Sequence, residues 1–194
     1  MNQTTKLLMA AGLLLTATSA AAHTGHGAHA ESGFLGGLLH PMLGLDHLLA
    51  MAAIGFWSVR QNNLMKNATP AFVIGGMILG AALAWGGLSL PGVEIGITFS
   101  VLVAGILIAT LAKLPTAIGG TLVGAFMLFH GFAHGIEMPA GATLAAYLVG
   151  FSIATLAITM VGRGLGSLML KADSRFSRGV GGVLAVAGAY LAAA

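Results

Sequence analysis

Residues 40–51 read His-Pro-Met-Leu-Gly-Leu-Asp-His-Leu-Leu-Ala-Met, which places two imidazoles and a carboxylate inside an otherwise apolar segment. An ionisable side chain near the middle of a membrane costs at least ~2.5 kcal/mol, so such side chains indicate a functional site by default. A later apolar run ends in a second stretch of this kind, His-Gly-Phe-Ala-His-Gly-Ile-Glu at residues 130–137. The two stretches together predict one polar site within a membrane domain.

The polar groups of the two stretches are suited to binding a metal. They are His40, Asp46, His47, His130, His134 and Glu137. Neutral imidazole nitrogens and hard carboxylate oxygens suit a divalent first-row metal. The chain has no cysteine, which excludes zinc fingers, iron–sulfur clusters, copper(I) thiolate sites and disulfides. An interhelical hydrogen bond would explain any one histidine alone, but the cluster favours a metal site.

The spacing within each stretch indicates how the ligands face the site. The ligands of the second stretch are spaced i, i+4 and i+7, which puts them on one stripe of a regular helix. In the first stretch His40 and His47 are seven residues apart, but Asp46 would point about 100° away. Pro41 and Gly44 allow a kink there. Asp46 is then expected either to bind the metal or to hold the proton of a ligating imidazole.

The composition is that of a membrane protein. Of the 194 residues, 57% are hydrophobic and 7% are charged, whereas soluble proteins average about 25% charged residues. The 30 glycines fit this class, because small residues let transmembrane helices approach closely. The net charge of +3 does not indicate nucleic-acid binding, because the basic residues lie in short connections and do not cluster with aromatic residues.

Residues 1–22 have the pattern of a cleaved signal peptide. Lys6 lies in a short polar start, an apolar core follows, and Ala20-Ala21-Ala22 ends an Ala-x-Ala cleavage pattern. The alternative is an uncleaved transmembrane helix, but the apolar core is shorter than the ~20 residues needed to span a membrane.

Residues 23–33 are predicted to form a histidine-rich periplasmic tail after this cleavage. The tail carries His23, His26 and His29 in a glycine-rich context. Short histidine-rich tracts bind metals loosely. The tail is therefore expected either to capture metal or to be an unstructured polar extension.

Residues 34–194 are predicted to form an all-α, polytopic domain of six transmembrane helices. The uncharged runs are residues 32–59, 67–93, 95–112, 114–136, 138–162 and 179–194. Each is long enough, or nearly so, to cross ~30 Å of hydrocarbon. The first and fourth runs carry the two polar stretches and head two groups of three. This order suggests an inverted repeat as a hypothesis, although the halves share little sequence.

Basic residues predict the orientation of the domain. They follow the first, third and fifth runs: Arg60, Lys66, Lys113, Arg163, Lys171, Arg175 and Arg178. Because lysine and arginine accumulate in cytoplasmic loops, both ends of the mature chain should be periplasmic. His40 then lies ~9 Å, and His130 ~10 Å, below the outer ends of their helices at 1.5 Å per residue. The two stretches are thus expected at the same depth.

The two stretches also resemble a known family. His-Pro-x-x-Gly-x-Asp-His-Leu-Leu-Ala-Met, followed by Phe-His-Gly-x-Ala-His-Gly-x-Glu, is similar to the motif pair of the HupE/UreJ family of bacterial nickel or cobalt permeases. The resemblance covers essentially the whole mature chain. It implies a multi-pass inner-membrane transporter, not an enzyme, that carries Ni²⁺ or Co²⁺ as substrate and supplies a metalloenzyme such as hydrogenase or urease.

Other functions remain to be weighed against a permease. A membrane-embedded zinc hydrolase could use Asp46 or Glu137 as base, although the chain has no His-Glu-x-x-His motif. Haem binding by paired histidines is disfavoured, because carboxylates beside the axial ligands would be unneeded. No Gly-x-x-x-x-Gly-Lys-Ser/Thr loop is present, so a permease should work passively or on an ion gradient.

Overall fold

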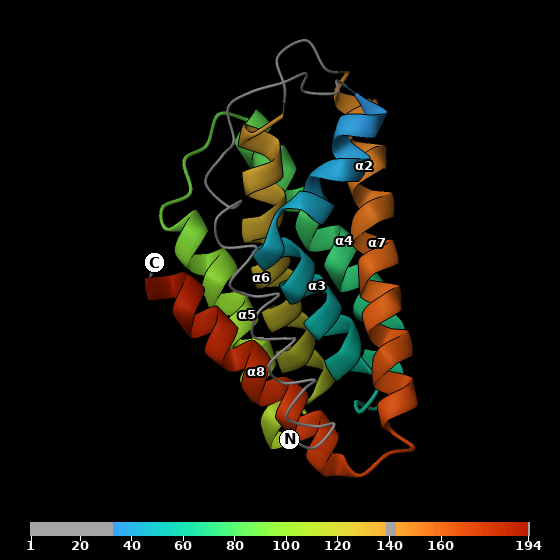
Figure 1. The fold of residues 1–194 in the computed structure, drawn as a ribbon. Helices are drawn as coiled ribbons and strands as arrows, with labels where there is room; N and C mark the ends of the chain where they lie inside the picture. Colours follow the sequence, from blue (N-terminus) through green and yellow to red (C-terminus); the bar gives the residue numbers. More distant parts are fainter. Residues whose placement is uncertain (1–32, 139–142, 194) are drawn as a thin grey trace. The chain divides into compact units, whose positions relative to one another are not determined.

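The computed structural model describes residues 33–138 and 143–193. The predicted signal peptide and the tail histidines His23, His26 and His29 lie outside these described residues. The helices of the described part are α2 (Phe34–Leu43), α3 (Leu45–Ser58), α4 (Asn63–Trp85), α5 (Val93–Thr110), α6 (Thr116–Ile136), α7 (Leu144–Met169) and α8 (Ser174–Ala193) (Figure 1). The described residues contain no strand, so the all-α prediction is confirmed for them.

Five of these helices, α4 to α8, are each long and apolar enough to cross a membrane. The first predicted span instead consists of two shorter helices, α2 and α3, which meet at an angle of 83°. If this bent pair is counted as one broken span, the described part has up to six spans. The chain is a multi-pass membrane protein, and the kink expected at Pro41 and Gly44 is a break between two helices.

The ends of the helices differ from the ends of the predicted uncharged runs, because some charged residues lie in helical turns and not only in loops. α7 continues to Met169, so Arg163 lies within it, and the Arg163 side chain donates a hydrogen bond to the Lys66 carbonyl over 3.0 Å. α4 begins at Asn63 because the side chain of Asn62 caps its first turn. A long basic side chain can carry its charge out of the apolar region while its backbone stays helical.

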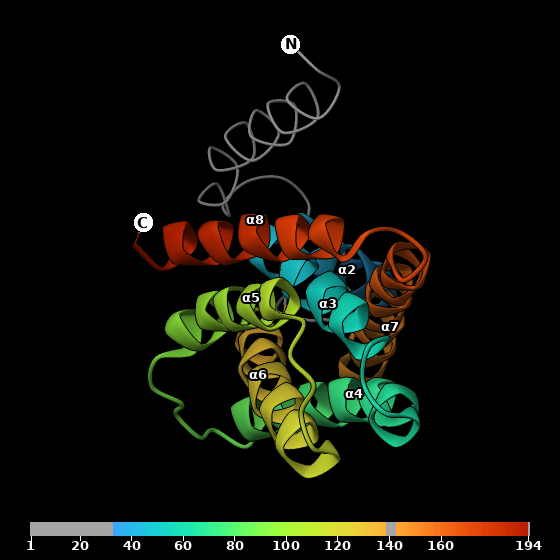
Figure 2. The same ribbon diagram turned by 90° about the horizontal axis from the view of Figure 1, so that it is seen from below.

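The helices pack in three close pairs, α4 with α6, α5 with α8, and the bent pair α2/α3 with α7 (Figure 2). Glycines on both members bring the backbones together. A Cβ atom at Gly80 of α4 would collide with the Leu128 carbonyl of α6, and one at Gly131 of α6 would collide with that of Met77. Such close contact is typical of small residues between transmembrane helices.

This pairing supports the inverted-repeat hypothesis. If the first, second and third spans correspond to the fourth, fifth and sixth, the pair α4 with α6 corresponds to the pair α7 with α2/α3. The pair α5 with α8 then corresponds to itself. If the two halves are exchanged, each of the three closest helix pairs of the described part therefore becomes another of these pairs or stays the same pair.

Three connections that carry basic residues meet at one end of the helices. Arg60, after α3, donates to the hydroxyl of Ser177 on α8 over 2.9 Å. Gln61 donates to the Ala112 carbonyl after α5 over 3.0 Å, and Asn62 donates to Thr116 of α6 over 3.1 Å. These bonds place the α3–α4, α5–α6 and α7–α8 connections together, as the one-sided distribution of basic residues requires.

We expect this end to be cytoplasmic, and cysteine labelling in intact cells tests the orientation. The chain has no native cysteine, and Asn62, Lys113 and Ser174 are exposed. Single cysteines at these positions should resist an impermeant thiol reagent, whereas a cysteine at exposed Leu88, in the α4–α5 connection, should react. Labelling of the first three positions in sealed cells would contradict the orientation.

Candidate metal site

The first polar stretch is divided between two helices by the break at Gly44. Gly44 is extended, with φ −84° and ψ 112°, and separates α2 from α3. Pro41 lies within α2 and removes a backbone donor just before this break. A Cβ atom at Gly44 would lie 3.1 Å from His47 Nδ1 and 3.2 Å from Asp46 Oδ1. The lack of a side chain at Gly44 thus leaves room for the side chains that follow the break.

Asp46 and His47 form a local pair in the first turn of α3. Asp46 Oδ1 accepts hydrogen bonds from the His47 backbone N–H over 2.7 Å and from His47 Nδ1 over 2.9 Å. A carboxylate bonded in this way fixes the tautomer and orientation of an imidazole. The proton of His47 therefore sits on Nδ1, and the lone pair is on Nε2. This Nε2 is buried and has no hydrogen-bond partner among the described residues.

The second polar stretch supplies its histidines from one face of α6, as their spacing predicts. His130 and His134 are both fully buried. The His134 ring stacks on Phe151 of α7, with ring centroids 5.2 Å apart and planes 11° apart. Neither nitrogen of His134 has a hydrogen-bond partner within the described part of the chain. Both nitrogens of this imidazole are thus without a competing protein partner.

Glu137 closes the other side of the site. α6 ends at Ile136, and Glu137 follows as its C-cap residue. His40 Nε2 donates to Glu137 Oε2 over 2.8 Å, and the side chains are 35% and 44% exposed, respectively. This pair joins α2 to the end of α6 at the more accessible end of the site.

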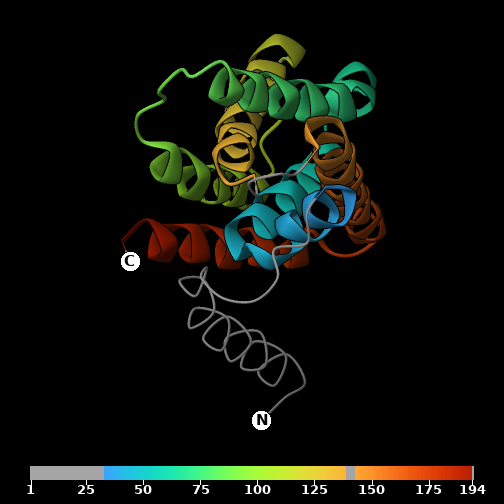
Figure 3. The same cartoon turned by 90° about the horizontal axis from the view of Figure 1, so that it is seen from above.

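The four imidazoles form a continuous series from this accessible end into the protein. The ring centroids are 4.9 Å apart for His40 and His134, 4.8 Å for His134 and His47, and 4.6 Å for His47 and His130. The structure therefore brings together all six ligands predicted within the helices. Figure 3 shows α2, α3, α6 and α7, which carry the two stretches and Phe151, gathered in one region.

The three groups nearest the accessible end have the spacing of a metal site. His40, His134 and Glu137 each offer one ligand atom, and these atoms lie within 4.8 Å of one another. Two ligand atoms on one ion, each at about 2.1 Å, are separated by at most ~4.2 Å. Small side-chain rotations would bring the three groups onto one ion.

The site carries an energetic cost that packing alone does not explain. Four buried imidazole nitrogens, on His47, His130 and His134, have no hydrogen-bond partner among residues 33–138 and 143–193. Each buried, unsatisfied polar group costs about 1–3 kcal/mol. Apolar residues would fill the same space at lower cost, which favours a ligand-binding role.

Sequence reasoning missed three neighbours of the histidines. Ser100 of α5 contacts His130 Nε2 over 3.0 Å, Phe151 stacks on His134, and the Tyr147 ring lies 6.5 Å from that of His40. The Tyr147 hydroxyl is buried without a partner among the described residues. Isolated serine, phenylalanine and tyrosine residues in apolar helices carry no motif, so only the packing identifies them.

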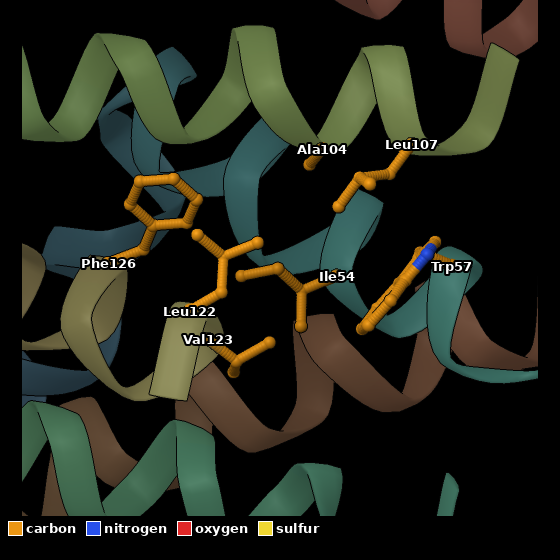
Figure 4. A pocket seen from close by; sticks show the side chains of 7 residues that line it. All are labelled: Ile54, Trp57, Ala104, Leu107, Leu122, Val123 and Phe126. Atoms are coloured by element: carbon orange, nitrogen blue, oxygen red, sulfur yellow. The ribbon is translucent and has the colours of Figure 1, made fainter. Parts of the chain in front are cut away.

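The helices that carry His47 and His130 also line an apolar cavity together with α5. Ile54 lies seven residues beyond His47 on α3, and Phe126 lies four residues before His130 on α6. They line a small cavity with Trp57, Ala104, Leu107, Leu122 and Val123 (Figure 4). The cavity thus lies on the helices that carry His47 and His130, and none of its lining residues is a histidine.

Comparisons with known proteins agree with the motif pair. The family model described as HupE / UreJ protein matches residues 11–191. Protein HupE of Rhizobium leguminosarum bv. viciae is 41% identical over 171 residues, which cover 88% of this chain and 89% of that protein. No solved structure matches. On the strength of the family match and of this relative, the chain belongs to the HupE/UreJ family.

Proposed function

We propose that this protein is a secondary transporter for divalent transition-metal ions, with nickel as the first candidate and cobalt as the second. The observation that carries the proposal is the convergence of four imidazoles and two carboxylates from two distant stretches of a membrane protein. Imidazole and carboxylate suit nickel, and family membership supports this assignment. We place the protein in the bacterial inner membrane, supplying a metalloenzyme such as hydrogenase or urease.

The burial of the ligands suggests the direction of entry. Glu137 and His40 are part-exposed, His134 is fully buried, and the His47 and His130 rings follow it in the series. In the proposed path a hydrated cation first meets the Glu137 carboxylate, which attracts it and replaces part of its water. It then passes to the neutral nitrogens of His134, His47 and His130. Adjacent sites of this kind let an ion enter and leave without being held too tightly.

Asp46 has a supporting role in this path. Its oxygen holds the His47 proton on Nδ1, which leaves Nε2 for the metal, and its negative charge offsets part of the charge of the cation. In the proposed periplasmic orientation, the tail histidines His23, His26 and His29 would raise the local metal concentration without being required.

Metal accumulation in cells is the experiment that tests the proposed function. Cells that express the chain are offered nickel, cobalt and zinc singly and in competition, and the metal retained is measured. The wild type should accumulate nickel, and cobalt should compete with it. His40→Ala should lose most of this accumulation at equal protein level in the membrane, because it removes a ligand at the entry.

Two outcomes would contradict the proposed transport function. One is equal accumulation of nickel and cobalt with and without the chain. The other is normal uptake by the His40→Ala variant at ordinary expression. A purified wild type that retains zinc while no cellular accumulation depends on the chain would instead favour a metal hydrolase.

A further inference from the structure

Ser100 lies in the middle of α5 and contacts the most deeply placed imidazole of the site. Its side chain is fully buried. Its hydroxyl oxygen lies 2.6 Å from the Ile97 carbonyl oxygen of the preceding turn and 3.0 Å from His130 Nε2. A single hydroxyl therefore contacts a backbone acceptor and a ring nitrogen at once.

These two contacts together determine where the His130 proton lies. The Ile97 carbonyl can only accept a hydrogen bond, and a serine hydroxyl has one proton to donate. Two oxygens 2.6 Å apart need that proton between them. The Ser100 oxygen must then accept from His130, so the imidazole carries its proton on Nε2. The lone pair of His130 is left on Nδ1, which is buried and has no partner among the described residues.

We propose that Ser100 is a positioning residue that holds His130 in the Nε2-protonated tautomer and thereby presents Nδ1 as a metal ligand. This inference rests on the proposed function. It assigns to α5, which carries neither polar stretch, a part in building the site. In metal-binding histidines, the hydrogen bond of the ring nitrogen that does not bind the metal commonly fixes the tautomer and the orientation of the ring in this way.

The arrangement complements the Asp46–His47 pair. Asp46 holds the proton of His47 on Nδ1, whereas Ser100 holds the proton of His130 on Nε2. The two rings lie 4.6 Å apart and nearly perpendicular, at 87°. One imidazole thus offers Nε2 and its neighbour offers Nδ1. The acceptor for His47 is the charged carboxylate of Asp46, whereas the acceptor for His130 is the neutral hydroxyl of Ser100. Of these two acceptors, only Asp46 therefore adds charge to the site.

Ser100→Ala removes the acceptor and tests the proposal through the imidazole itself. Nitrogen NMR of full-length, metal-free protein with labelled histidine reports which nitrogen of each ring is protonated, and a His130→Gln variant identifies the signals of His130. The wild type should show His130 protonated on Nε2. The Ser100→Ala variant should show a displaced Nε2–H signal or a fraction protonated on Nδ1. Ser100→Thr, which keeps the hydroxyl, should retain the wild-type signature.

Ser58→Ala is the matched control. Ser58 is also fully buried, its hydroxyl also donates to the carbonyl three residues earlier, over 2.7 Å, and it contacts no imidazole in the described structure. Ser100→Ala should raise the nickel concentration for half-maximal uptake by about 10- to 100-fold. The control should leave both uptake and the His130 signals unchanged.

The NMR and uptake results separate failure of this inference from failure of the proposed function. A wild type protonated on Nδ1 of His130, or a His130 signal unchanged by Ser100→Ala, overturns the inference even if the cells accumulate nickel. A changed tautomer with unchanged uptake overturns the assignment of Nδ1 as a ligand. If the wild type accumulates no metal, the proposed function fails, while the NMR result still decides whether Ser100 sets the tautomer. Equal loss of uptake in Ser58→Ala would indicate a packing effect and overturn the specific role.

Discussion

Replacing Asp46 with asparagine should lower nickel uptake by about 10- to 100-fold, the loss typical when a carboxylate bonded to a metal-binding histidine is replaced. The amide oxygen of asparagine can still accept the two hydrogen bonds that Asp46 Oδ1 accepts from His47. The substitution therefore keeps shape and bonding but removes the negative charge beside a buried cation. Uptake kinetics at matched protein level in the membrane measure the effect.

Asp173→Asn provides the control for this substitution. Asp173 is exposed, and its carboxylate accepts a hydrogen bond from the Arg175 backbone over 2.9 Å, before the first turns of α8. Asparagine caps helices about as well as aspartate, so uptake should not change. Wild-type uptake by Asp46→Asn would show that its charge is not needed and that the hydrogen bonds to His47 suffice.

Replacing Gly80 with alanine should strongly destabilise the folded protein. A Cβ atom at this position of α4 would collide with the Leu128 carbonyl of α6, and the Phe132 backbone nitrogen also lies in its way. Backbone atoms cannot rotate aside as a side chain can, so α4 and α6 must separate. Overpacking typically costs about 1–3 kcal/mol, and a collision between backbones should reach the upper part of that range. Denaturation of the purified protein in detergent measures the loss.

Gly75→Ala is the control for Gly80→Ala because it places the same change on the same helix. Gly75 is exposed, and an added Cβ atom meets nothing within 4 Å. Alanine favours a helix over glycine by roughly 0.5–1 kcal/mol, so this variant should be as stable as the wild type or slightly more stable. Equal stability of the two variants would contradict the close approach of α4 and α6.

The composition and the two polar stretches were sufficient to predict an all-helical membrane domain. The i, i+4 spacing of His130 and His134 correctly placed both imidazoles on one face of α6. Pro41 and Gly44 correctly indicated a distortion in the first span. These features are local, because they depend on helical periodicity and on backbone chemistry within a few residues.

The remaining features depend on contacts between distant segments. Pro41 and Gly44 permit a bend, but its angle follows from how α2 and α3 both pack on α7. Charged residues were expected to mark the helix ends, yet Arg163 lies inside α7 because its long side chain reaches the Lys66 carbonyl. Ser100 resembles any serine of an apolar helix until α5 is placed beside α6.

X-ray absorption of the nickel-loaded, purified protein tests most directly whether the histidines of α2, α3 and α6 form one metal site. His23, His26 and His29 are replaced first, so that only histidines of the helices can contribute. The spectrum should contain outer-shell scattering from more than one imidazole, and this scattering should fall when His47 and His130 are replaced by alanine. Nickel surrounded only by oxygen ligands, or a spectrum that these two replacements leave unchanged, would contradict the site.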